Sequence, residues 1–316
     1  MNFHLKQLLM ALALILLLNL LIFFNREKGF AYIKYADKEE LYPAKPAKRF
    51  LLKWSDAKEF SNEEIEEGLS ILKKQAGIDT ILSLQDKVVR IAAWVYSELS
   101  HRNGKPGDTL KKLTPLQQYL YLKEHKDEKI WCGNFQSIFG FFSSCIGLPK
   151  RYVELVPETK GANGYHEINE VFLPDQNKWI MVDITRNMLL IKKGDQIFSA
   201  ADYLDHKIKQ PTNMVLASQS IRLSPQVNFL QEAPVLTDSF FNSKYALRYY
   251  KTLDLSGAYN PMSKIKRYIF GSPLYQMYDP VHPHSNFLFR IRQLFLFALL
   301  VCLLLFLPIS IKKINP

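Results

Sequence analysis

The 316-residue sequence predicts an α+β fold with a helical lead-in, a helix that begins at a cysteine, and an antiparallel sheet, all set between two transmembrane helices. Three observations support this prediction. Apolar residues recur at helical spacing over residues 61–146, and short strand-like runs follow over residues 151–184. Two runs near the chain ends, residues 7–24 and 293–311, contain no charged residue and are long enough to cross a hydrocarbon core of about 30 Å.

Each helix of the lead-in is marked by its own start signal. Ser61 begins a capping box, S-N-E-E, before an apolar stripe that Gly77 ends. A second box at Ser83 and a Thr-Pro pair at Thr114 open two further helices. An all-helical segment therefore leads to Cys132.

The next helix begins at Cys132, because Phe135, Ile138, Phe139 and Phe142 follow it at helical spacing. A thiol at a helix N-terminus lies close to unbonded backbone N–H groups and the positive end of the helix dipole. Both stabilise the thiolate, which is the nucleophilic form of cysteine. The same N–H groups are suited to hold an oxyanion.

Three runs predict strands: residues 151–156, 167–173 and 178–184. The last two are joined by a four-residue turn, residues 174–177, so they are expected to pair antiparallel. His166, at the start of one strand, and Asp183, at the end of its partner, then lie at the same end of the hairpin. Together with Cys132 they supply a nucleophile, a base and an orienting carboxylate.

The sequence around these side chains resembles the transglutaminase-like (transglutaminase core) superfamily over residues 80–187. The likeness rests on four runs: WCG at 131–133, GLPKRYV at 147–153, YHEINE at 165–170 and KWIMVDIT at 178–185. Two positions depart from the family pattern. Ile168 stands where many relatives have an aromatic residue, and Ile184 stands where a proline often follows the aspartate. The resemblance implies a papain-like transglutaminase core but carries over no substrate preference.

The resemblance also implies roles for the three side chains: Cys132 as nucleophile, His166 as general base and acid, and Asp183 as the orienting carboxylate. Trp131 is a candidate donor to the oxyanion through its indole N–H, and Arg186 is a candidate contact for a substrate carboxylate. The expected function is acyl transfer through a thioester on the cysteine. Hydrolysis of amide bonds, as in a protease or amidase, is favoured over transfer to an amine because water is the default acceptor.

A non-catalytic alternative stays open, because the superfamily includes members that have lost catalysis. In that alternative the chain is a transglutaminase-like binding or scaffold module of the cell envelope. The expected partner of the enzyme is a protein or peptide substrate, or an envelope polymer. The net charge of +11 favours acidic lipid or envelope polymer over nucleic acid, since no nucleic-acid motif accompanies the charge.

Two membrane spans would place both chain ends on one side of the membrane and the domain on the other. The flanking charges are nearly balanced and do not decide the orientation. The resemblance favours a two-pass protein of the plasma (bacterial inner) membrane with its catalytic domain outside the cytoplasm.

Neither a cofactor nor a metal is expected, because no ligand spacing typical of a metal site and no cofactor motif occurs. The three cysteines do not indicate a disulfide scaffold. Cys302 lies in the second expected span, and Cys145 lies about 19 Å along the same predicted helix from Cys132.

The expected organisation follows the chain: a tail (1–6), a transmembrane anchor (7–24), a juxtamembrane stalk (25–49), the transglutaminase-like domain (50–193), an extension of uncertain fold (194–292), a second transmembrane helix (293–311) and a tail (312–316). Within the extension, Ser199 and Asp238 are expected to begin helices, the second of which runs to Tyr250.

Overall fold

The computed structural model of the chain describes residues 3–24, 34–54, 60–157, 166–186, 188–193, 196–209, 217–220, 245–250, 275–281 and 286–314. The chain divides into two compact units. The larger unit contains Ala36–Ser256 and Met277–Pro280, and the smaller contains Met1–Tyr35, Gly257–Gln276 and Val281–Pro316.

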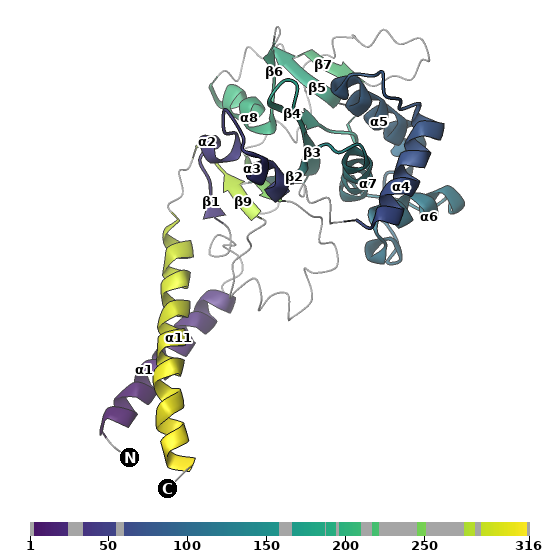
Figure 1. The fold of residues 1–316 in the computed structure, drawn as a ribbon. Coiled ribbons are helices and arrows are strands. Elements are labelled where there is room, and N and C mark those ends of the chain that lie inside the picture. Colours follow the sequence, from purple (N-terminus) through teal and green to yellow (C-terminus); the bar gives the residue numbers. More distant parts are fainter. Residues whose placement is uncertain are drawn as a thin grey trace. The chain divides into compact units, whose positions relative to one another are not determined.

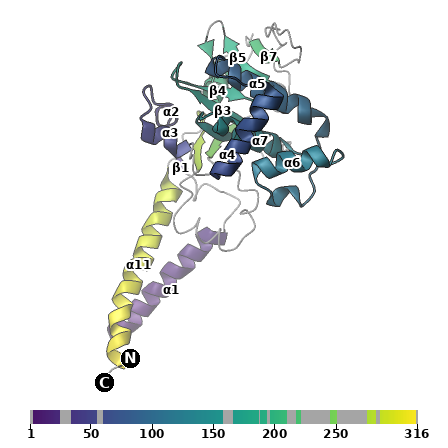
Figure 2. The ribbon, with the colours of Figure 1, turned by 45° about the vertical axis from the view of Figure 1, so that its right-hand side comes forward.

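The smaller unit is built on two long helices that lie side by side, α1 (Phe3–Phe24) and α11 (Phe287–Ile314) (Figures 1 and 2). A polar contact joins them. The buried side-chain amide of Asn19 donates to the carbonyl of Ile15 at 2.8 Å and to that of Phe295 in α11 at 3.4 Å. The short strand β1 (Lys34–Tyr35) also belongs to this unit.

The expected transmembrane helices are wrong. Among the residues that the structure describes, none of the helices combines the length and the apolar character that crossing a membrane demands. This finding overturns the anchors placed at residues 7–24 and 293–311, and with them the two-pass placement in the plasma (bacterial inner) membrane.

The helical lead-in belongs to the larger unit and consists of α4 (Asn62–Ile71), the π-helical segment η3 (Leu72–Ala76), α5 (Leu84–Leu99), the 3₁₀ turns η4 (Ser100–Arg102) and η5 (Leu110–Lys112), and α6 (Pro115–Glu124). The capping box at Ser61 is confirmed, because its hydroxyl accepts from the backbone N–H of Glu64 at 3.2 Å. Gly77 ends the first helix in the left-handed conformation, with φ of +62°. Thr114 caps α6 in the same way as Ser61 caps α4.

The helix α7 (Cys132–Cys145) lies between this helical group and the sheet (Figures 1 and 2). Its predicted start at Cys132 is confirmed. The stripe of Phe135, Ile138, Phe139 and Phe142 is at most 1% exposed. Burying apolar side chains of this size stabilises the fold by about 1.5–3 kcal/mol each, so the packing of α7 fixes the position of its first turn.

Within the larger unit, the strands of the larger sheet follow the order β9-β8-β2-β3-β4. These strands are β2 (Lys150–Pro157), β3 (His166–Leu173), β4 (Lys178–Val182), β8 (Tyr245–Tyr250) and β9 (Tyr275–Tyr278). The predicted hairpin is confirmed, since β3 and β4 pair antiparallel with Asn169 opposite Val182 and Leu173 opposite Lys178. Alternate residues of β3 pack on opposite faces: Val171 joins the core that contains α7, and Phe172 joins a second core on the other face.

The helix expected from Asp238 to Tyr250 is wrong where the structure describes it. Residues 245–250 form β8, which pairs antiparallel with β2, and residues 238–244 lie outside the described part of the chain. The sequence YALRYY is rich in aromatic residues that favour strands, and its pairing partner is nearly a hundred positions away. The expected helix start at Ser199 is confirmed, because its backbone N–H donates to the carboxylate of Asp202 at 3.1 Å.

A smaller sheet, of order β6-β5-β7, contains β5 (Met188–Lys193), β6 (Gln196–Ile197) and β7 (Ala217–Ser220). The helix α8 (Ala200–Lys209) follows β6 and packs into the second core through Tyr203 and Leu204.

The face of the larger sheet opposite α7 is covered by α2 (Lys38–Leu41) and α3 (Lys48–Trp54). Arg151 is fully buried there, and its guanidinium carbon lies 4.1–5.2 Å from the ring centroids of Tyr42, Trp54, Trp179 and Tyr249. Glu170 pairs with it, since the Arg151 Nε donates to Glu170 Oε2 at 2.7 Å.

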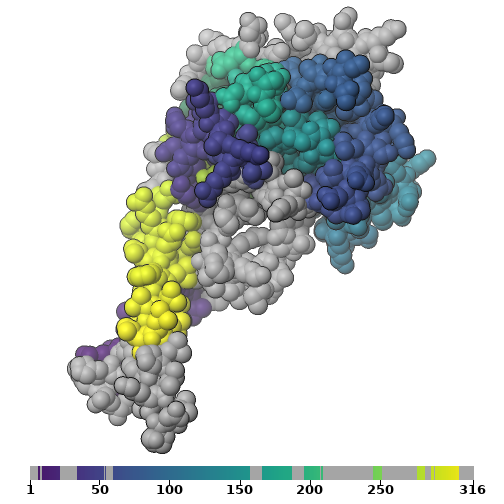
Figure 3. Space-filling model, viewed as in Figure 1, coloured from purple at the N-terminus to yellow at the C-terminus, as the bar shows by residue number. Residues whose placement is uncertain are grey.

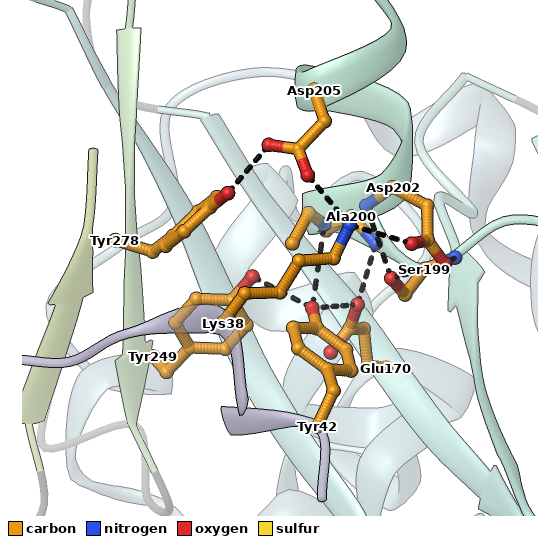
Figure 4. Close-up of polar contacts among 10 residues, drawn as sticks. Lys38, Tyr42, Glu170, Ser199, Ala200, Asp202, Asp205, Tyr249 and Tyr278 are labelled. Carbon is orange, nitrogen blue, oxygen red and sulfur yellow. Dashed lines mark hydrogen bonds and ion pairs between the residues drawn. The ribbon is translucent and has the colours of Figure 1, made fainter. Parts of the chain in front are cut away.

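Glu170 also connects this segment to α8 (Figure 4). Its Oε1 accepts from the Tyr42 hydroxyl at 2.8 Å and from the backbone N–H of Ala200 at 2.6 Å. Lys38 adds an ion pair with Asp205 at 2.6 Å. Figure 3 shows this N-terminal segment, in purple, on the surface beside the green of α8.

Candidate active site

Cys132 is the first residue of α7, and it is partly exposed. Asn134 fixes this helix start. Its side-chain oxygen accepts from the backbone N–H of Trp131 at 3.1 Å, and its amide donates to Gln118 Oε1 of α6 at 3.0 Å. Because these bonds tie the first turn to α6, the thiol lies at a fixed helix N-terminus, where the first N–H groups have no intrahelical acceptor.

The residue two positions before Cys132 is held by a short parallel bridge. Ile130 donates its backbone N–H to the carbonyl of Arg102 at 2.9 Å and accepts from the N–H of Gly104 at 3.0 Å. The buried Arg102 guanidinium in turn donates to the carbonyls of His125 and Lys126. The chain segment that leads to Cys132 is therefore bonded to the loop that follows α5.

His166 and Asp183 lie at the same end of the β3–β4 hairpin, as the sequence predicts. His166 Nε2 lies 2.6 Å from Asp183 Oδ2, and the two residues are 5% and 0% exposed. The second carboxylate oxygen of Asp183 accepts from the backbone N–H of Arg186 at 3.2 Å. The carboxylate is thus held on both oxygens, and it engages one nitrogen of the imidazole.

The electrostatics of His166 link it to both partners. Burial lowers its pKa, but the charge of Asp183, the hydrogen bond with Asp183 and a hydrogen bond with Cys132 outweigh burial and raise the pKa from 6.5 to about 9. Since Asp183 occupies Nε2, Nδ1 is the ring nitrogen left for the thiol. The structure therefore brings Cys132, His166 and Asp183 together, with an imidazole that is charged at neutral pH.

The two further contacts expected from the sequence lie beside this trio. Trp131 immediately precedes the cysteine and is 48% exposed. The Arg186 side chain is partly exposed, and its Nε lies 4.0 Å from Asp183 Oδ2, so its charge lies next to the triad carboxylate.

A charged cluster next to His166 was not expected from the sequence. Glu167 stands opposite Glu154 in the β2–β3 pairing, and Glu154 stands opposite Arg248 of β8, with which it forms an ion pair. Burial and the charge of Glu154 raise the pKa of Glu167 to about 7, against the opposing effects of Tyr250, Arg248 and His166. Only the strand register reveals this cluster, although an acidic residue directly after the histidine is visible in the sequence.

The role of Asn134 at the start of α7 was also not expected from the sequence. The signal was present, because a residue with a side-chain acceptor three positions after a helix N-cap can accept the N-cap N–H, as in a capping box.

Among the residues that the structure describes, no three His, Cys, Asp or Glu side chains gather as ligands for a metal ion. The chemistry available at the site is that of a thiol, an imidazole and a carboxylate.

No protein-family model and no curated protein matches the chain. Among solved structures, one similar chain is titled "Putative Cysteine Protease from Cytophaga hutchinsonii", with 14% sequence identity and a TM-score of 0.28. The match covers 48% of this chain and 43% of the other. A likeness this weak does not indicate a function for this chain.

Proposed function

We propose that the chain is a cysteine-dependent acyl-transfer enzyme that hydrolyses amide bonds in peptides or proteins, with Cys132, His166 and Asp183 as its triad. The observation that carries this proposal is the 2.6 Å contact between His166 Nε2 and Asp183 Oδ2, beside a partly exposed cysteine that hydrogen-bonds with the same imidazole. A nucleophile, a base and a group that orients the base are the parts that covalent catalysis requires.

Before the reaction, His166 holds the thiol proton as the imidazolium, and in the first half-reaction the thiolate sulfur of Cys132 attacks the substrate carbonyl carbon. The carbonyl π electrons move to the oxygen, where N–H groups at the start of α7 stabilise the negative charge. The carbonyl re-forms as the C–N bond breaks, and the imidazolium gives its proton to the leaving amine. The products are the amine and a thioester on Cys132.

In the second half-reaction, His166 takes a proton from water, and the resulting oxygen nucleophile attacks the thioester carbonyl. The C–S bond breaks, the acid is released, and the thiolate of Cys132 and the imidazolium of His166 are restored. Asp183 stabilises the charged imidazole in both halves and holds its tautomer. Partial exposure of Cys132 gives an acceptor access to the thioester, and we favour hydrolysis over transfer to an amine because water is the default acceptor.

The test is turnover of peptide mixtures by the full chain, with products and the acylated protein identified by mass spectrometry. We expect Cys132→Ser to abolish product and thioester formation. Cys145→Ser is the matched control, because Cys145 ends the same helix but is buried, and burial raises the pKa of its thiol to about 12. Turnover that survives in Cys132→Ser would exclude Cys132 as the nucleophile, and a wild-type chain that forms neither product nor thioester would leave the scaffold module.

A further inference from the structure

Gln136 lies one helical turn after Cys132, on the stripe of α7 that faces the sheet. Gly140, one turn further along that stripe, meets Tyr152 and Asn169 of β2 and β3. Gln136 is fully buried, and its Nε2 lies 3.5 Å from the hydroxyl oxygen of Thr185. The helix that carries the nucleophile therefore contacts the segment that follows β4.

This segment is the turn that presents Asp183. The pairing of β3 with β4 runs only as far as Val182, so Asp183 lies just beyond the regular ladder. The turn is closed by the backbone N–H of Arg186, which donates to Asp183 Oδ1 at 3.2 Å, and Thr185 lies inside it. The contact between Gln136 and Thr185 thus joins the base of the Asp183 turn to the cysteine helix.

Folding alone gives no reason for an amide at position 136. Buried positions of α7 on both sides of it, such as Phe135, Ile138 and Phe139, are apolar, and the Gln136 Oε1 has no hydrogen-bond partner among the described residues. A buried polar atom without a partner costs more than an apolar group of the same size. What the amide adds is its contact with Thr185.

We propose that Gln136 is a positioning residue of the triad, which holds the Asp183 turn at a fixed distance from Cys132 through Thr185. The inference rests on the proposed function. Catalytic groups need placement to within about 0.5 Å, and a misplacement of about 1 Å costs up to about 100-fold in rate. Asp183 can orient His166 toward the thiol only if the turn and the helix keep their spacing.

The test compares Gln136→Met, which keeps the length of the side chain but removes its amide, with the wild-type chain. The readouts are the alkylation rate of Cys132 by iodoacetamide from pH 5 to 9, peptide turnover and the thermal midpoint. We expect alkylation at pH 6 and kcat to fall about tenfold, with KM and the thermal midpoint nearly unchanged. A purely structural role for Gln136 would change the thermal midpoint and leave the pH profile of alkylation as it is.

Thr185→Val removes the other side of the contact at a partly exposed position, so it is available if Gln136→Met fails to fold. It should give the same defect, and the double variant should be no worse than either single variant. The matched control is Ser143→Ala, because Ser143 is on the same helix, fully buried and without a partner for its hydroxyl among the described residues. It should alkylate Cys132 within twofold of the wild-type rate.

Wild-type alkylation rates in both Gln136→Met and Thr185→Val would overturn the positioning role while the triad itself stands. Failure of the proposed function has a different signature. In that case Cys132 of the wild-type chain would react at pH 6 no faster than an ordinary thiol, whatever residue occupies position 136.

Discussion

Replacing Asp183 by Asn removes the charge that raises the pKa of His166 while it keeps the shape of the side chain. The difference between a pKa of about 9 and the ordinary 6.5 is about 2.5 units. At 1.36 kcal/mol per unit, the imidazolium is stabilised by about 3 kcal/mol in the folded protein. Without Asp183, burial is the largest remaining effect and lowers the pKa, so at pH 7.5 the imidazole should change from almost wholly charged to mostly neutral.

The consequence for the reaction is large. An amide at this position also allows the wrong imidazole tautomer, a change that costs on the order of 10⁴ in kcat in the comparable serine triad. We therefore expect turnover in Asp183→Asn to fall by at least about 10³, and alkylation of Cys132 to follow the pH profile of an ordinary thiol. Combining it with His166→Ala should cost little beyond the worse single change, because the residues act as a unit.

The same substitution has a defined effect on stability. A histidine whose folded pKa is raised stabilises the fold fully below its unfolded pKa of 6.5, and this stability is lost as pH rises through about 9. Denaturant unfolding should show Asp183→Asn less stable than wild type by about 3 kcal/mol at pH 6, with a smaller difference at pH 10. A difference that is constant with pH, together with an unchanged alkylation profile, would refute the ion pair.

Three substitutions test other parts of the structure. The pKa of Glu167 is raised to about 7, so the stability of the wild-type chain falls as pH rises from about 4.5 to 7. In denaturant unfolding, Glu167→Gln should therefore be more stable than wild type by up to about 3 kcal/mol at pH 8 and no more stable at pH 4. An equal gain at both pH values would contradict this. Gly147 has φ of +76°, and the position that a Cβ would occupy is open space, so Gly147→Val should cost only backbone strain, about 1–2 kcal/mol. An unchanged melting temperature would argue against this strain. Glu170→Gln leaves the buried Arg151 charge unpaired and should lower the free energy of unfolding by about 3–5 kcal/mol. A loss below about 1 kcal/mol would contradict this prediction.

The sequence predicted the elements whose signals are local. Ser61 and Thr114 mark helix starts, and the stripe after Cys132 marks α7, because capping and helical periodicity act within one or two turns. The proximity of His166 to Asp183 was also predictable, because a four-residue turn fixes which strand ends meet.

What the sequence did not predict depends on distant pairing. Residues 245–250 were expected to be helical, yet they form a strand because β2 offers them a partner. The ion pair of Arg248 with Glu154, and so the charge next to Glu167, exists only through that pairing. The expected membrane helices were wrong because an uncharged run does not by itself show that a helix can span a bilayer.

The central claim is that Cys132 is an activated nucleophile, and the three cysteines of the chain allow one measurement to test it. The chain is exposed briefly to iodoacetamide at pH 6, where ordinary thiols are protonated, and labelling of Cys132, Cys145 and Cys302 is quantified by peptide mass spectrometry. Cys145 is the internal reference, because burial raises the pKa of its thiol to about 12. The account predicts rapid labelling at Cys132, abolished in His166→Ala, with Cys145 unlabelled. Labelling of Cys132 at the rate of a free thiol, unchanged in His166→Ala, would contradict it.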